Sequence, residues 1–169
     1  MSEIRTGLGW DSHRIAPGRT LILGGVTVPC EFGLEGHSDA DVLTHAITDA
    51  ILGAAALGDI GTHFPDTDPK WKGCASLLFL RHARELVESA GYRITNVDSN
   101  VILERPKLKD YREKIRQELA GALGIDLERV SVKFKTAEGV GPAGEGRSAE
   151  AQAMVTLQRL GTGPFHESV

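Results

Sequence analysis

Acidic and imidazole side chains crowd into one early stretch of this chain. Seven of the ten Asp and four of the six His lie between positions 11 and 68. Such groups repel one another and lose their hydration at a cost when they are brought together, unless a cation lies among them. A bound divalent metal is the simplest cation to expect.

Asp11, His13 and His45 are the candidate metal ligands. Asp11 and His13 are two residues apart, so an extended strand places both side chains on one face, and His45 joins them from a predicted helix. One carboxylate and two imidazoles suit zinc or another borderline divalent ion, with a fourth tetrahedral position left open for catalysis. The plainer alternative is that Asp11 caps a turn and His45 makes an ordinary hydrogen bond.

His37 and Ser38 precede the predicted helix. The pattern Ser38-Asp-Ala-Asp41 resembles a capping box, with Ser38 as N-cap. The free N–H groups and the positive dipole end at such a start favour an anion, so this segment is a candidate phosphate site. A plain N-cap at Ser38 is the alternative, and it is compatible with the phosphate role.

A second polar group follows a predicted strand. Lys133, Lys135 and Thr136 bring positive charge and a hydroxyl to its end, and Glu138 offers an oxygen to a hard cation such as magnesium. The alternative for each residue singly is a solvated strand end. Gly139–Gly144 matches G-x-G-x-x-G, but a strand-like segment follows instead of a helix, so we reject a dinucleotide site.

The periodicity predicts an α+β fold with two layers, in which a mixed β-sheet packs on helices. Residues 1–160 are expected to form a single domain and residues 161–169 a flexible C-terminal tail. Strands are predicted at 4–10, 92–103, 130–136 and 149–160, and two more in 21–28 on either side of a Gly24-Gly25 turn. Helices are predicted at 39–56, 76–90 and 110–123. Residues 58–69 are expected to form a surface loop. A small-residue stripe of Val42, Ala46, Ala50 and Gly53 should pack closely on the sheet.

The composition narrows the function classes. An apolar fraction of 41% is ordinary for a globular protein, and a net charge of −4 argues against nucleic-acid binding. No apolar run is long enough to span a membrane. Cys30 and Cys74 are expected to be buried apolar residues and not a disulfide, which places the protein in the cytoplasm. No P-loop, no G-x-S-x-G elbow and no Cys nucleophile is present, so we expect no covalent catalysis.

Several motifs spread over nearly the whole chain carry a family resemblance. They are Gly9-Trp-Asp-Ser-His13, Leu23-Gly-Gly25, the run from His37 to Asp49, Leu57-Gly-Asp-Ile-Gly61, Phe64-Pro-Asp-Thr-Asp-Pro69, Arg105-Pro-Lys107 and Lys135-Thr-Ala-Glu138. On these motifs the chain resembles the 2-C-methyl-D-erythritol 2,4-cyclodiphosphate synthases of the non-mevalonate isoprenoid pathway.

The resemblance implies roles for individual residues. Asp11, His13 and His45 would hold zinc, Glu138 would reach a second ion (magnesium or manganese), and His37 and Thr136 would be catalytic by orienting phosphates. Residues implied in substrate binding are Asp11, His13, His37, Ser38, Asp59, Ile60, Gly61, Phe64, Pro65, Asp66, Thr67, Asp68, Leu103, Pro106, Lys107, Leu108, Lys109, Lys135, Thr136, Ala137, Glu138 and Pro142.

The resemblance also implies a reaction and an assembly. The 2-phosphate of a small diphosphocytidyl substrate would attack the β-phosphorus within the same molecule, with metal assistance and release of CMP. The enzyme would be a homotrimer with active sites at the subunit interfaces. The segment Gly141–Arg147 is two residues shorter than in many relatives, and Arg147 is a candidate substitute for a displaced family arginine.

Two other functions share parts of this pattern. A non-haem iron oxygenase also uses two His and one carboxylate, but it leaves the phosphate-binding features without a role. A non-enzymatic metal- or nucleotide-binding regulator would bind CDP or CMP without turnover. Iron with oxygen-dependent turnover would favour the first, and binding without turnover the second.

Overall fold

A mixed five-stranded sheet forms the centre of the computed structural model, which describes residues 3–161. The strand order is β4-β1-β7-β5-β6, where β5 and β6 are parallel and the other neighbours antiparallel. The strands are β1 (Ile4–Pro17), β4 (Phe32–Leu34), β5 (Tyr92–Ile102), β6 (Val130–Lys135) and β7 (Ser148–Arg159), and β2 (Leu21–Leu23) pairs with β3 (Val26–Val28) in a separate hairpin.

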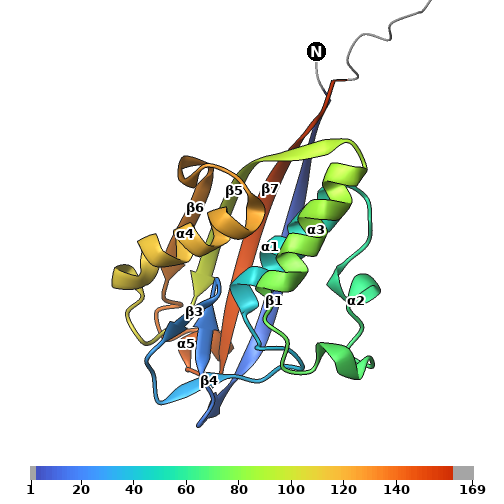
Figure 1. The fold of residues 1–169 in the computed structure, drawn as a ribbon. Helices are drawn as coiled ribbons and strands as arrows, with labels where there is room; N and C mark the ends of the chain where they lie inside the picture. Colours follow the sequence, from blue (N-terminus) through green and yellow to red (C-terminus); the bar gives the residue numbers. More distant parts are fainter. Residues whose placement is uncertain (1–2, 162–169) are drawn as a thin grey trace, which may run out of the picture.

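Helices cover one face of this sheet (Figure 1). They are α1 (Val42–Ala54), α3 (Leu77–Ser89) and α4 (Arg112–Leu123). The chain also has the single-turn helices α2 (Ile60–His63) and α5 (Gly141–Gly144) and 3-10 turns at Pro69–Trp71, Lys109–Tyr111 and Leu127–Arg129. The expected two-layer α+β fold with a mixed sheet is confirmed. Within residues 3–161, no helix is long and apolar enough to cross a membrane.

Glycines in β1 let α1 lie directly on the strand. A Cβ added to Gly9 would stand 1.9 Å from the carbonyl oxygen of Ala46, and one added to Gly7 would stand 2.0 Å from that of Ala50. The close approach brings the helix backbone against β1 and sets His45 beside Asp11 in the middle of that strand. The predicted small-residue stripe is wrong at Gly53, which is exposed with open space around it.

The helix does not begin where the sequence pattern placed it. We predicted a start at Asp39 with Ser38 as N-cap, but α1 starts at Val42 and its N-cap is Asp41. The Asp41 carboxylate accepts hydrogen bonds from Thr44 N (3.1 Å) and Thr44 Oγ1 (2.7 Å). A carboxylate of the chain itself therefore caps the first turn of α1. The phosphate role of His37 and Ser38 stays a prediction.

A distant turn explains why Asp41 takes this place. The same buried carboxylate accepts from Gly24 N (2.9 Å) and Gly25 N (2.7 Å), which belong to the turn between β2 and β3. Both glycines have positive φ, of 56° and 76°, where L side chains are strained. The turn thus offers two N–H groups to Asp41 and ties the hairpin to the start of α1.

Other predicted boundaries also changed. The first strand continues to Pro17 and does not end at Trp10, because β7 and then β4 pair with its second half. β4 lies in a segment for which no strand was predicted, and α2 lies in the predicted 58–69 loop. Cys30 and Cys74 are only partly buried. The predicted tail lies outside the described residues apart from its first position, so the tail and domain bounds stay predictions.

The sheet face opposite the helices carries exposed apolar side chains on β1 and β7. Side chains alternate along a strand, so Leu8 and Trp10 point away from the helix that Gly7 and Gly9 contact. Leu8 is 73% exposed, Trp10 56% and Met154 53%, and Leu8 pairs with Met154 across β1 and β7. Large exposed apolar patches of this kind mark interaction surfaces.

Candidate active site

The second half of β1 and the first turn of α1 bring Asp11, His13 and His45 together. Asp11 Oδ2 lies 2.9 Å from His13 Nε2 and 3.0 Å from His45 Nδ1. The two ring nitrogens are 3.1 Å apart. Within residues 3–161 this is the one group of three or more His, Cys, Asp or Glu side chains arranged to hold a metal ion.

The donor set fits a tetrahedral cation. Zinc bonds of about 2.0–2.1 Å to nitrogen and oxygen imply ligand atoms roughly 3.3 Å apart, close to the observed spacing. His13 Nδ1 donates to the carbonyl oxygen of Glu35 at 2.5 Å, so Nε2 is the ring nitrogen that faces the group and can offer its lone pair once an ion replaces its hydrogen. A small outward movement of three side chains would therefore admit an ion.

The charges in the group also suit a cation. Burial alone would raise the pKa of Asp11, but hydrogen bonds from His13 and His45 outweigh it and hold the pKa far below its usual value. Burial on its own would lower the pKa of His13. The hydrogen bond to Asp11 outweighs this effect, so the pKa of His13 is raised above its usual value. The carboxylate is thus ionised at neutral pH and attracts positive charge.

A cavity of about 500 Å³ opens beside the three ligand atoms. Its lining is His13, His37, Ser38, His45, Ile60, Gly61, Phe64, Pro65, Asp66, Thr67, Trp71 and Phe79. Sequence reasoning missed Trp71 and Phe79. Phe79 lies in the predicted helix 76–90 one turn before Ala83, which is buried, so helical periodicity together with its aromatic type could have found it.

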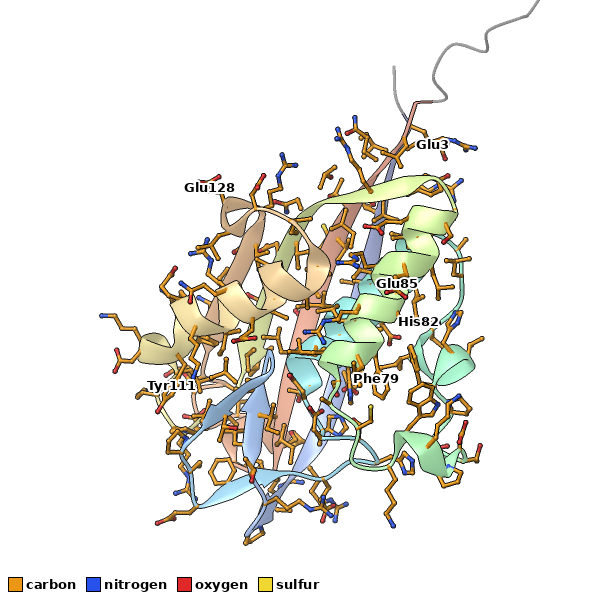
Figure 2. All side chains as sticks on the ribbon, in the orientation of Figure 1. Glu3, Phe79, His82, Glu85, Tyr111 and Glu128 are labelled. Atoms are coloured by element: carbon orange, nitrogen blue, oxygen red, sulfur yellow. The ribbon has the colours of Figure 1, made fainter. Side chains whose placement is uncertain are left out.

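Aromatic rings form one wall of this cavity. Phe64 stacks on Phe79 with centroids 4.4 Å apart, and Trp71 meets Phe64 edge-on at 5.1 Å. Phe79 lies at the end of α3 nearest to α2 (Figure 2). The His45 ring is 6.2 Å from that of Phe79, so the ligand group borders an apolar surface. Such a wall excludes water and strengthens electrostatic interactions beside it.

Helix α1 also holds the segment that lines the cavity. Asp49 Oδ1 accepts from Ile60 N at 2.7 Å. Burial raises the pKa of Asp49, and the nearby carboxylates of Asp59 and Asp11 raise it further. Asp59 caps α2 by accepting from Thr62 N at 2.8 Å and does not line the cavity. The predicted substrate residue Asp59 therefore has a structural partner in this chain.

Asp68 lies at the rim and not in the lining. Its carboxylate accepts from Lys70 N at 3.0 Å, and its carbonyl oxygen accepts from His37 Nε2 at 3.4 Å. Since this bond engages the His37 ring, it orients that side chain at the cavity.

A second, cationic pocket of about 220 Å³ lies between the end of β5 and the end of β6. Its lining is Leu103, Glu104, Pro106, Lys107, Leu108, Lys109, Arg112, Phe134, Lys135 and Thr136. Sequence reasoning missed Glu104, Arg112 and Phe134. The Arg112 guanidinium lies 5.5 Å from the Phe134 ring centroid, a contact between distant segments that no local pattern reveals.

Two predicted residues adjoin this second pocket without lining it. Ala137 N donates to Glu104 Oε2 at 3.1 Å, and Thr136 Oγ1 donates to Glu138 Oε1. Glu138 has a positive φ of 50°, an uncommon conformation for a residue with a side chain. These bonds set the turn after β6 and point the Glu138 carboxylate toward Thr136.

Comparison with known proteins decides the family. A family model described as the YgbB family matches residues 4–158. This chain belongs to the YgbB family. It is 78% identical over 159 residues to the 2-C-methyl-D-erythritol 2,4-cyclodiphosphate synthase of Solibacter usitatus, covering 94% of this chain and 100% of that protein. The resemblance drawn from the sequence motifs is confirmed.

Other YgbB-family relatives agree in sequence and fold. The enzyme of the same name from Gloeobacter violaceus is 58% identical over 92% of this chain and 96% of its own. The solved structure of Plasmodium falciparum IspF in a complex with CDP superposes with a TM-score of 0.83 at 39% identity, covering 95% of this chain and 99% of that one.

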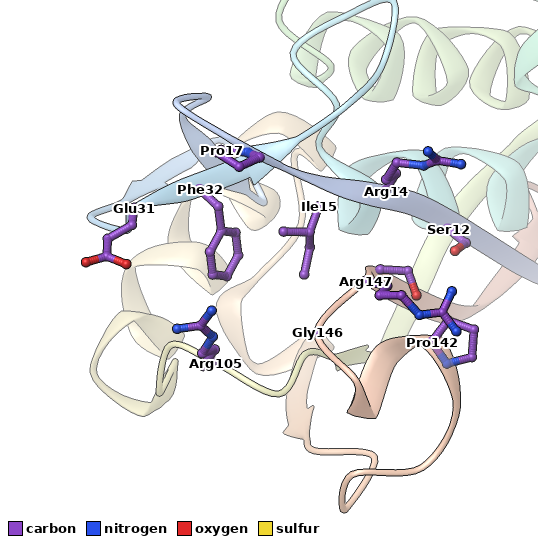
Figure 3. Close-up of a pocket in the computed structure, with 11 residues that line it drawn as sticks. Ser12, Arg14, Ile15, Pro17, Glu31, Phe32, Arg105, Pro142, Gly146 and Arg147 are labelled. Carbon is purple, nitrogen blue, oxygen red and sulfur yellow. The ribbon is translucent and has the colours of Figure 1, made fainter.

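Pro142 and Arg147 lie apart from both pockets of this YgbB-family chain. They line a third hollow of about 790 Å³, together with Arg14, Phe32 and Arg105 among others (Figure 3). The Arg147 guanidinium pairs with Glu145 at 2.7 Å. Within one chain the structure therefore does not bring Pro142 to the other predicted substrate residues, and the substitute role of Arg147 stays a prediction.

Proposed function

We propose that this chain cyclises 4-diphosphocytidyl-2-C-methyl-D-erythritol 2-phosphate to 2-C-methyl-D-erythritol 2,4-cyclodiphosphate and releases CMP. The observation that carries the proposal is the Asp11, His13 and His45 group, with its ligand atoms within 3.1 Å of one another at the edge of a cavity. The family supports the same reaction. Neither an iron oxygenase nor a regulator accounts for 78% identity to a named synthase.

Zinc is the ion we propose for this group, because one carboxylate and two imidazoles with an open side suit it. When bound there, it supplies Lewis-acid polarisation of a phosphate oxygen. We propose that Glu138 holds a second ion, magnesium or manganese, since a carboxylate oxygen is the ligand these ions prefer.

The remaining residues are proposed to bind and orient the substrate. His37 and Ser38 lie in the cavity lining beside His45, where they can contact the phosphate that attacks. The segment 60–67 and the aromatic wall enclose space for the erythritol part. The attacking phosphate is already an anion, so the chain needs no strong base. Orientation of such an intramolecular attack can be worth about 7–11 kcal/mol.

The second pocket is proposed to hold the cytidine and its phosphates. Lys107, Lys109 and Lys135 supply positive charge there, and Thr136 is placed to orient the diphosphate. The Plasmodium falciparum relative was solved in a complex with CDP, which is in keeping with a cytidine nucleotide ligand. Departure of CMP is favoured by cationic partners for its phosphate.

A homotrimer with sites between subunits is the assembly we propose. Of the described residues, none lines both the cavity beside His45 and the cationic pocket, so two neighbouring chains can each supply one half. The uncovered apolar face of Leu8, Trp10 and Met154 offers the surface that such an assembly would bury.

One experiment tests the proposed reaction together with the proposed metal group, by which we mean Asp11, His13 and His45. We expect Asp11→Asn to lose bound zinc and most CMP release from the authentic substrate while keeping its circular dichroism spectrum. Asp126→Asn, a change at an exposed ion pair with Arg129, is the control and should keep both. Parental CMP release by Asp11→Asn in metal-stripped buffer would overturn the assignment.

A further inference from the structure

A buried serine stands behind the metal group on the side away from the other ligands. Ser76 is 0% exposed and lies at the N-cap position of α3, yet its side chain makes no capping hydrogen bond. A serine at this position usually accepts from the helix amides. Here Ser76 Oγ lies 2.8 Å from His45 Nε2 and donates to Asp39 Oδ1. Its hydroxyl therefore serves the imidazole and not the helix.

The donors and acceptors around Ser76 determine where the hydrogens between Asp39, Ser76 and His45 Nε2 lie. Asp39, as a carboxylate, can only accept, and Ser76 has one hydroxyl hydrogen, which goes to Asp39. The Ser76 oxygen must then accept from His45, so Nε2 of His45 carries a hydrogen. The other ring nitrogen, Nδ1, points at Asp11 and His13. An ion bound there takes the place of the hydrogen that Nδ1 shares with Asp11 and receives its lone pair.

We propose that Ser76 and Asp39 are positioning residues that fix the ring tautomer of His45 for metal binding. The inference deepens the proposed function and rests on the metal group described there. Asp39 is itself held in place: its Oδ2 accepts from Ser76 N at 3.0 Å and its Oδ1 from Asp41 N at 3.3 Å. Oriented hydrogen bonds of this kind behind a ligand typically contribute 10–100-fold to metal affinity.

Because Ser76 bonds to His45, Ser38 is not needed to hold the imidazole. Its Oγ lies 3.0 Å from His45 Nε2 and 3.3 Å from Ser76 Oγ. Because Ser76 accepts the imidazole hydrogen, Ser38 is free to turn to a phosphate in the cavity that it lines. Ser76 does not line that cavity and is not exposed, so the two serines have separate tasks.

The test measures zinc affinity of the purified full-length protein by competition with a chromophoric chelator. We expect Ser76→Ala to weaken zinc binding by about 10–100-fold. Asp39→Asn should act in the same direction, because its amide can donate to Ser76 and turn the hydroxyl hydrogen toward His45 Nε2. Ser76→Thr keeps the hydroxyl and should restore much of the affinity.

Ser99→Ala is the matched control, since Ser99 is also buried and donates to the carbonyl oxygen of Ser131 away from the metal group. It should lower the melting temperature without changing zinc affinity. The Co(II)-loaded Ser76→Ala protein should show an altered ligand-field absorption spectrum. Zinc affinities of Ser76→Ala and Asp39→Asn within twofold of the parent would overturn the inference. Tight zinc binding by Asp11→Asn would instead refute the metal group itself.

Discussion

At the scale of single residues, the chemistry depends on which atoms have spare lone pairs or hydrogens. Glu35 and Ser76 engage the far nitrogens of His13 and His45, so the near nitrogens face Asp11 together. The same reasoning separates Ser38, which lines the cavity, from Ser76, which does not. Removing the Ser38 hydroxyl should therefore affect turnover, whereas removing the Ser76 hydroxyl should affect zinc binding.

Ser38→Ala should lower CMP release by about 10–100-fold while leaving bound zinc near the parental level, because the loss of one hydrogen bond to a charged phosphate costs about 1.5–3 kcal/mol. Turnover and metal content measured on the same preparation check this. An unchanged rate would count against a phosphate role for Ser38, and a matching loss of zinc would assign it to the metal group instead.

The metal-free protein should show a pH-dependent stability set by two groups. The lowered pKa of Asp11 gives stability that is present above its unfolded value of about 3.9 and lost as pH falls toward its folded value. The raised pKa of His13 gives stability that is present below about 6.5 and lost as pH rises through its folded value. Melting temperatures in chelator should thus fall as pH rises above about 6.5.

With zinc added, the trend should reverse, because the ion needs neutral imidazoles. His13→Gln should remove much of the fall seen in chelator. A flat melting temperature between pH 6 and 8 in the metal-free parent, or an unchanged slope in His13→Gln, would contradict the pairing of Asp11 with His13.

At the scale of elements, the site depends on how closely α1 lies on β1. His45 comes from the helix, Asp11 and His13 come from the strand, and Gly7 and Gly9 remove the side chains that would hold the two apart. Asp41 then fixes the axial position of α1 by binding the β2–β3 turn. The candidate metal ligands meet because α1 packs closely on β1, and because Asp11 and His13 are two residues apart and so face the same side of that strand.

Gly9→Ala should destabilise the fold by about 1–3 kcal/mol or more, since its Cβ meets backbone and not a flexible side chain. It should also weaken zinc binding by moving His45 away from Asp11. Gly53→Ala on the same helix has open space and should instead stabilise by about 0.5–1 kcal/mol. Denaturant unfolding measures both, and equal stability of the two variants would contradict the close packing.

Local patterns predicted only part of these elements. The alternation of Asp11 and His13 needs no partner strand to be recognised, and helical spacing sufficed to place His45 on the helix. The N-cap at Asp41 could not be predicted, because it depends on N–H groups of Gly24 and Gly25 far away in the sequence. The extension of β1 to Pro17 depends in the same way on pairing with β4 and β7.

At the scale of the whole molecule, the proposed trimer rests on two separate pockets and on the exposed Leu8, Trp10 and Met154. The cationic pocket was found in part through Lys107, Lys135 and Thr136, whereas Glu104, Arg112 and Phe134 reach it through tertiary folding. Pro142 lies in a separate hollow of the single chain. The family motifs suggest its substrate role, which no local pattern in the sequence predicts and which in the proposed trimer would depend on a neighbouring chain.

Trp10→Glu should convert the proposed trimer to monomers, because a charge buried without a partner costs on the order of 3–5 kcal/mol. CMP release should fall with it if each site needs two chains. Leu78→Glu, at an apolar residue of α3 that is 48% exposed, is the control and should leave the mass unchanged. Sedimentation velocity gives the mass, and an intact trimer of Trp10→Glu would argue against this face as the interface.

The most direct test of the proposed site is anomalous diffraction at the zinc edge from crystals of the protein grown with CDP. We predict one strong peak bonded to Asp11 Oδ2, His13 Nε2 and His45 Nδ1, with the nucleotide in the cationic pocket of a neighbouring subunit and its phosphates directed toward the metal. A nucleotide bound far from this group, or three ligand side chains turned apart with no peak between them, would contradict the account.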